Sequence, residues 1–274
     1  MHGSSHPADF PPGFAPQPSP EDPRPTRFSP SALETYRECP RRFWFAYVRR
    51  VRSPQRPTAS LVLGQAVHLT LATLYKLPQP MRSAEMAHTV LRRAWARQDR
   101  SDVFLNAEEE ASWGRRALRM LDDFCGGWDL RIRPLAVEEW VRARLPEAGV
   151  ELFGKADRID QARSRPGVEV IDYKTGQPRP EDDDLARQLP ARLYALAAFR
   201  SFGQPVHRVR YIWLAERWEV TWQPEVEDLA EAQSQFGAMA AFIGDDREWV
   251  PAPGPGCRVC PYVSICPGQE VGEP

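Results

Sequence analysis

Two aspartates and a lysine between Phe153 and Gly176 have the types and spacing to hold a divalent metal ion beside a water molecule. The runs GKADRID and GVEVIDYKTG flank a polar turn that contains proline and glycine, so we expect them to pair as an antiparallel hairpin. Asp172 and Lys174 are two residues apart, which places both side chains on one face of a strand. If Asp157 faces the same way, two carboxylates converge beside an ammonium. Such oxygen ligands suit magnesium or manganese.

A solvated salt bridge on a surface hairpin explains these three residues equally well, because exposed ion pairs are common and contribute little stability. Two further motifs bear on the choice. The segment LGQAVHLTL places Gly64 and His68 four residues apart on a predicted helix, and the segment AVEEW contains Glu138. Together with GKADRID and VIDYKTG, these motifs resemble the PD-(D/E)XK nuclease superfamily. The resemblance is to its RecB-type exonuclease branch with a C-terminal iron-sulfur cluster, similar to CRISPR-adaptation and AddB-type nuclease domains.

The resemblance implies an enzyme that hydrolyses phosphodiester bonds with Mg²⁺ or Mn²⁺. It implies that the metal ligands are His68, Asp157, Asp172 and the backbone carbonyl of Tyr173. Lys174 would position the attacking water and stabilise the transition state. Glu138 would contribute through a metal-bound water or by orienting other groups.

The last motif of the family, a glutamine and a tyrosine four residues apart on a helix, is represented here by Gln188 and Tyr194. The resemblance makes both of them candidate catalytic residues. Their separation is six residues, and Pro190 lies between them. Six residues turn a helix by about 240°, so the two side chains share a face only if the segment around Pro190 is not helical.

The cysteines form a second candidate metal site. Cys257, Cys260 and Cys266 have the spacing C-x2-C-x5-C, and Cys39 precedes them in the N-terminal part of the chain. The sequence shows no secretory signal, so we expect reduced thiols and metal ligation rather than disulfides. Four thiolates suit zinc or a [4Fe-4S] cluster equally by number. The resemblance favours the iron-sulfur cluster. Cys125 lies on an apolar helical stripe and is expected to be an inert core thiol.

The hydrophobic pattern predicts an α/β protein. Helices are expected at 30–48, 61–77, 83–99, 108–125, 184–201 and 224–243, and strands at 135–145, 150–160, 167–174, 206–214 and 217–222. This order fits the restriction-endonuclease-like core that the resemblance implies, a mixed sheet flanked by helices, with helical N-terminal additions and a C-terminal iron-sulfur module. Residues 1–27 are expected to be a disordered proline-rich tail. Residues 28–274 are expected to form one nuclease domain, closed by a cluster on Cys39, Cys257, Cys260 and Cys266.

A basic and aromatic stretch from Arg37 to Arg56 is a candidate track for single-stranded DNA, although the whole chain has a net charge of −1. Arginine pairs with phosphates, and aromatic rings stack on unpaired bases. An amphipathic helix with its rings in the core and its charges in solvent explains the same pattern. The candidate DNA-binding residues are Arg41, Arg42, Arg49, Arg50 and Arg52.

The sequence therefore predicts a cytoplasmic, metal-dependent DNA exonuclease that acts on single-stranded ends in repair, recombination or CRISPR adaptation. No stretch is long and apolar enough for a membrane span. The chain lacks a GxxxxGK[ST] loop, so any unwinding would require a separate helicase, and CRISPR-adaptation proteins are the other candidate partners. A catalytically silent nuclease fold that binds DNA beside such partners is the alternative.

Overall fold

The computed structural model describes residues 16–52, 57–163, 165–178 and 180–270. The chain divides into two compact units. One comprises Met1–Gln55, Arg144–Phe153 and Ala230–Pro274, and the other comprises Arg56–Ala143 and Gly154–Leu229. All candidate metal-site residues belong to the second unit, and the four candidate cluster cysteines belong to the first. The expectation of a single domain over residues 28–274 stays a prediction.

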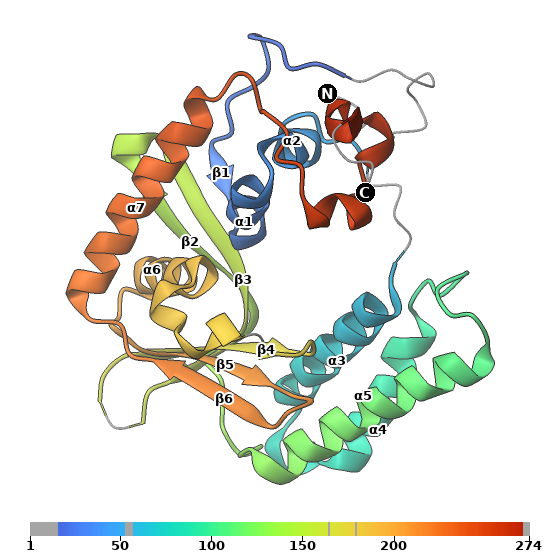
Figure 1. Ribbon diagram of the computed structural model, residues 1–274. Helices are drawn as coiled ribbons and strands as arrows, with labels where there is room; N and C mark the ends of the chain where they lie inside the picture. Colours follow the sequence, from blue (N-terminus) through green and yellow to red (C-terminus); the bar gives the residue numbers. More distant parts are fainter. Residues whose placement is uncertain (1–15, 53–56, 164, 179, 271–274) are drawn as a thin grey trace. The chain divides into compact units, whose positions relative to one another are not determined.

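The second unit is built on a mixed sheet (Figure 1). β3 (Val150–Gln161) pairs antiparallel with β4 (Val168–Lys174), which lies parallel to β5 (Val206–Trp213). β6 (Trp218–Trp222) pairs antiparallel with β5, and β2 (Ala136–Leu145) pairs with β3. The predicted hairpin between the third and fourth strands is confirmed.

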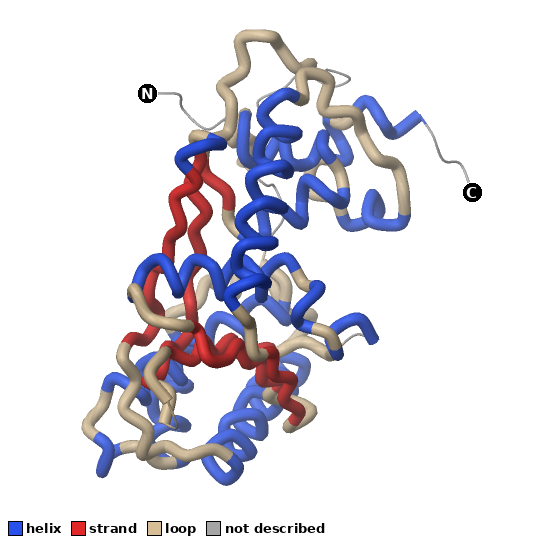
Figure 2. Tube along the Cα trace, turned by 90° about the vertical axis from the view of Figure 1, so that its left-hand side faces the viewer, coloured by secondary structure: helices blue, strands red, loops and turns tan. Residues whose placement is uncertain are grey.

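Helices cover both faces of this sheet (Figure 2). α3 (Ala59–Lys76), α4 (Ala84–Ala96) and α5 (Ala107–Gly127) pack together on one face, and their apolar stripes enclose Ile171 and Ile212 of the strands. Each of these helices begins with a polar side chain that accepts a hydrogen bond from a backbone N–H of the first turn, which stabilises the helix end. α6 (Leu189–Phe202) lies on the opposite face and makes the crossover between β4 and β5. The mixed sheet flanked by helices agrees with a restriction-endonuclease-like fold.

The periodicity places most elements within about two residues of their observed ends. Two helices differ. The helix predicted at 184–201 begins at Leu189, because Pro190 occupies its first turn, where a missing N–H costs nothing, and two short 3₁₀ turns precede it. The helix predicted at 30–48 breaks at Cys39, whose extended backbone (φ −161°) is the conformation that a residue before proline favours.

Aromatic side chains of the first unit pack near the helix break at Cys39. It contains β1 (Arg27–Phe28), α1 (Pro30–Glu38), α2 (Pro40–Phe43), a π-helical turn (Trp44–Val48) and most of α7 (Val226–Asp245). β1 lies parallel to the start of β3. The ring of Phe43 stacks on Trp249 and meets Tyr36 edge-on. These contacts fill the core of the unit.

Residues 1–15 of the predicted tail lie outside the described residues. The part that follows makes specific contacts with the first unit. The carboxylate of Asp22 accepts a hydrogen bond from the indole of Trp44 (2.7 Å), and the carbonyl of Pro16 accepts one from Arg41. Residues 16–26 are therefore a packed segment. Within the part of the chain that the structure describes, no helix is both long and apolar enough to cross a bilayer.

Candidate metal centre

The hairpin of β3 and β4 brings the two predicted aspartates together. Arg158 is paired with Ile171 in the antiparallel register, so Asp157 lies opposite Asp172 at the next position. The backbone N–H of Tyr173 donates to Asp157 Oδ2 (2.7 Å), which fixes the carboxylate. Both aspartates are about nine-tenths buried. The sequence thus predicted the convergence of these carboxylates correctly.

Three side chains in this region form a cluster that could hold a cation. Ligand atoms of His68, Glu138 and Asp157 lie within 4.8 Å of one another. His68 Nδ1 lies 2.9 Å from Asp157 Oδ1, and because an ionised carboxylate can only accept, Nδ1 carries the hydrogen. That hydrogen bond orients the imidazole and leaves Nε2 as its acceptor nitrogen. Two carboxylates and an imidazole are a donor set that fits a divalent cation such as manganese or magnesium.

Protons and a cation would compete for this cluster. Burial lowers the pKa of His68, but the hydrogen bond and charge of Asp157, with the charges of Asp172 and Glu138, outweigh burial, and the pKa is raised overall. Burial is also the largest cause that raises the pKa of Asp157, with the charge of Asp172 adding to it. The site therefore concentrates negative charge in a buried place, which a bound cation would relieve.

Glu138 reaches the cluster from a strained position in β2. Its φ of 57° lies in the left-handed region, which is uncommon for a residue other than glycine. Strain of this kind tends to gather at functional sites. The carboxylate also pairs with Lys155 Nζ, a residue that the sequence reasoning did not single out although it lies in the quoted GKADRID motif.

Asp172 and Lys174 form their own pair beside the cluster. Lys174 Nζ lies 2.5 Å from Asp172 Oδ2 and 4.4 Å from the centre of the Tyr211 ring. The group of three close ligand atoms contains Glu138 in addition to the predicted His68 and Asp157. Asp172 as a metal ligand stays a prediction. Lys174 is on the predicted face, next to the two aspartates. Its role in catalysis stays a prediction.

Two glycines of the motifs make close packing possible. A Cβ on Gly64 would lie 3.1 Å from Thr175 Oγ1, so this glycine lets α3 approach the end of β4 and bring His68 to the cluster. A Cβ on Gly154 would lie 2.8 Å from the ring of Tyr194. The hydroxyl of Tyr194 donates to the carbonyl of Lys155 (3.0 Å), which ties α6 to β3.

Gln188 lies just before α6, outside the helix that carries Tyr194. It is extended (φ −85°, ψ 124°) immediately before α6, and its side-chain amide donates to Asp182 Oδ1 (3.0 Å). Gln188 and Tyr194 therefore do not lie on one helix, as the position of Pro190 suggested. Their catalytic assignment stays a prediction.

The four candidate cluster cysteines border one small cavity of about 40 Å³ in the first unit. Backbone N–H groups donate to three of the sulfurs: Ala252 to Cys39 (3.5 Å), Tyr262 to Cys260 and Gly268 to Cys266. Among the described residues, the only three ligand atoms that lie mutually within 4.8 Å are those of His68, Glu138 and Asp157, so no three of the four sulfurs lie mutually within that distance. Burial raises the pKa of Cys125 to about 11, in keeping with an inert thiol.

The proposed basic track is corrected at Arg41. This arginine is 5% exposed, and its guanidinium donates to the carbonyls of Pro16, Glu248 and Trp249, so it is buried within the first unit and not exposed for a DNA backbone. Three aromatic residues of the stretch, Phe43, Trp44 and Phe45, are buried and cannot stack on bases. The core-facing alternative is therefore confirmed for these rings. Arg42 pairs with Glu38, and Arg49, Arg50 and Arg52 are exposed.

Comparison with known proteins gives one informative match. Residues 27–267 match the family model described as "PD-(D/E)XK nuclease superfamily". A search of curated proteins found no match. A solved structure titled "Crystal structure of SSO0001" is 13% identical in sequence and covers 76% of this chain and 85% of its own, with a TM-score of 0.35. A likeness at that level carries no argument about function.

Proposed function

Because the chain belongs to the PD-(D/E)XK nuclease superfamily, we propose that it is a metal-dependent DNA exonuclease that acts on single-stranded ends. The observation that carries the proposal is the cluster of His68, Glu138 and Asp157 beside the pair of Asp172 and Lys174. Phosphodiester hydrolysis needs neutralised phosphate charge and an oriented nucleophilic water. A buried anionic cluster with an adjacent ammonium supplies places for both.

Each residue of the site has a distinct part in this proposal. His68, Glu138 and Asp157 would hold Mg²⁺ or Mn²⁺, and Asp172 and the carbonyl of Tyr173 are further candidate ligands. When bound, the cation lowers the pKa of a coordinated water and offsets phosphate charge. Lys174 would orient the water and stabilise negative charge in the transition state. Tyr194 positions the β3 backbone beside Glu138 through Lys155.

The cysteines support a [4Fe-4S] cluster as a second cofactor. Four thiolates around one cavity suit a zinc ion or a [4Fe-4S] cluster by number, and the resemblance of the C-x2-C-x5-C motif favours the cluster. N–H groups directed at Cys39, Cys260 and Cys266 stabilise negative charge on sulfur. The cluster would join α1 to the C-terminal segment within the first unit.

The dependence on ends can be tested with three substrates of one sequence. We expect the protein to degrade linear single-stranded DNA with Mg²⁺ or Mn²⁺, and to degrade blunt duplex DNA more slowly. A covalently closed single-stranded circle should survive, because it has no end. Labels at the 5′ and 3′ ends of the linear strand will give the polarity. Cleavage of the circle at the rate of the linear strand would assign an endonuclease and refute this part of the proposal.

Exposed arginines of the first unit are the proposed contacts to the DNA backbone. We expect the variant Arg49→Gln, Arg50→Gln, Arg52→Gln to bind single-stranded DNA more weakly. The slope of log K against log salt concentration should be flatter by up to about 2, because each phosphate contact releases about 0.7 of a counterion. Fluorescence anisotropy over a salt series measures this slope. A matched variant on α4, Arg92→Gln, Arg93→Gln, Arg97→Gln, should keep the wild-type slope. An unchanged slope in the first variant would remove this segment from the DNA interface.

A role in repair, recombination or CRISPR adaptation would require a helicase or adaptation complex as partner, since the sequence has no nucleotide-binding loop of its own. A catalytically silent DNA-binding scaffold is the second candidate function. The observation that favours it is Gln188, which precedes α6 and so does not share a helix with Tyr194, unlike the family motif. The intact carboxylates and lysine of the hairpin favour the nuclease.

A further inference from the structure

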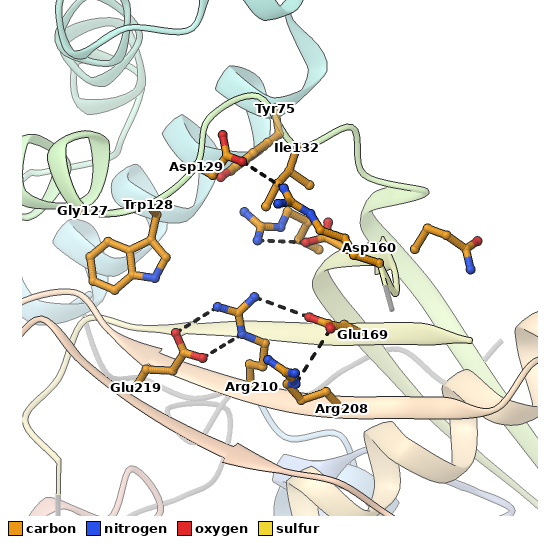
Figure 3. A pocket seen from close by; sticks show the side chains of 13 residues that line it. Tyr75, Gly127, Trp128, Asp129, Ile132, Asp160, Glu169, Arg208, Arg210 and Glu219 are labelled. Carbon is orange, nitrogen blue, oxygen red and sulfur yellow. Dashed lines mark hydrogen bonds and ion pairs between the residues drawn. The ribbon is translucent and has the colours of Figure 1, made fainter. Parts of the chain in front are cut away.

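A second polar cavity in the same unit is separate from the metal centre. It has a volume of about 460 Å³, within the range of ligand pockets, and Figure 3 shows the side chains that line it. None of His68, Asp172 and Lys174 borders it. Its walls come from the end of α3, the segment after α5, and the strands β3 to β6.

The charges that line this cavity balance one another. Four arginines and four acids face it, and they are paired: Arg158 with Asp160 (3.0 Å), Arg163 with Asp129 (2.9 Å), and Arg210 with both Glu219 (2.8 Å) and Glu169 (3.5 Å), while Arg208 lies 3.8 Å from Glu169. No excess of positive charge remains for a phosphate, and no excess of negative charge remains for a metal ion. A neutral ligand fits this balance.

Several buried atoms of the lining have no hydrogen bond to any described residue. They are Arg158 Nε, Asp160 Oδ1 and the hydroxyl of Tyr75. Arg158, Asp160 and Tyr75 are between 1% and 4% exposed. The guanidinium of Arg158 lies over the Tyr75 ring (4.3 Å). Buried polar atoms without protein partners are rare, so these atoms can bind polar groups of a ligand.

The buried polar atoms of the cavity determine which hydrogen-bonding groups the ligand must have. It must accept hydrogen bonds from the arginines and donate one to Asp160, with both kinds of group close together. Nucleobases carry ring acceptors beside exocyclic amino donors, and arginine and aspartate are their usual partners. Trp128 also borders the cavity, and indoles suit planar rings. From these observations we infer that the cavity binds a nucleobase, of a free nucleoside or of an unpaired base in a DNA strand.

Isothermal titration with guanosine tests this inference, because guanine has donors and acceptors on adjacent edges. We expect saturable binding of guanosine and none of ribose. Tyr75→Phe should weaken binding about tenfold, because the variant removes a hydroxyl that borders the cavity. Asp160→Asn should weaken binding further. Tyr47→Phe, on the exposed surface of the other unit, is the matched control and should bind as the wild type does.

A competition experiment distinguishes a free nucleoside from a base in a DNA strand. If guanosine displaces a short single-stranded oligonucleotide from a Tyr75-dependent site, the base belongs to a DNA strand; if it does not, the ligand is the free nucleoside. Either result supports the inference. Absence of guanosine binding at millimolar concentration, equal binding by Tyr75→Phe, or equal binding of ribose would overturn it. These measurements need no metal and no cleavage, so their failure would leave the proposed nuclease activity untouched.

Discussion

Lys174→Ala is expected to lower the rate of single-stranded DNA cleavage by a factor of about 100 or more, the scale seen when one preorganised charge-stabilising group is removed. The ammonium lies beside Asp172 on the face of β4 that carries the metal cluster, so its charge acts where negative charge develops. It donates no electron pair to a cation. Manganese binding and DNA binding should therefore stay close to the wild-type values while turnover falls.

Single-turnover cleavage with saturating protein separates these effects, because it isolates the chemical step from binding. Lys76→Ala is the matched control, since this lysine is exposed at the end of α3 and has no part in the site. The control should cleave at the wild-type rate. A Lys174→Ala variant that keeps the wild-type rate would exclude this lysine from catalysis, and one that loses manganese would assign it a structural role.

Cys39→Ser is expected to abolish the iron-sulfur cluster. Purified wild-type protein should be brown and contain iron and acid-labile sulfide, and the variant should lose both. Cys39 is the extended residue between α1 and α2. It borders the same cavity as Cys257, Cys260 and Cys266. Loss of this link opens the long loop between Cys39 and Cys257. The chain-entropy scale for such a loop is about 5 kcal/mol, which sets the expected loss of unfolding free energy.

Cys125→Ser is the matched control for that experiment. This thiol packs against the core of the second unit, far along the sequence from the other four, and its raised pKa makes it a poor metal ligand. The control should keep its colour, iron and sulfide. Anaerobically prepared wild-type protein with stoichiometric zinc and no sulfide would contradict the cluster and assign a structural zinc site.

Local pattern was enough to predict the hairpin and its aspartates. The strand run around Asp172 is short, apolar and bounded by turn residues, and the register of a hairpin follows from its turn. The break at Cys39 was missed because the apolar pattern continues on both sides of it. The extended backbone there depends on the following proline, a signal that was present in the sequence.

Contacts between distant segments account for the features that the local sequence did not predict. Arg41 is buried because it binds the carbonyl of Trp249, which is 208 residues away, and nothing in the local sequence distinguishes it from an exposed arginine. Glu138 joins His68 and Asp157 through the pairing of β2 with β3 and a left-handed backbone angle that propensity does not foresee. The polar cavity beside Arg158 and Asp160 likewise needs four strands and two helices in place before it exists.

The most direct test of the central claim is the metal dependence of cleavage by the wild-type protein and by Asp157→Asn. Asparagine keeps the size of the side chain but removes the carboxylate that contacts His68 and the Tyr173 N–H. We predict that the wild type degrades end-labelled single-stranded DNA in Mg²⁺ or Mn²⁺ and stops when a chelator is added, and that the variant is slower by a factor of about 100 or more. Degradation that persists in the chelator, or an Asp157→Asn variant that cleaves at the wild-type rate, would contradict a metal-dependent nuclease site at this cluster.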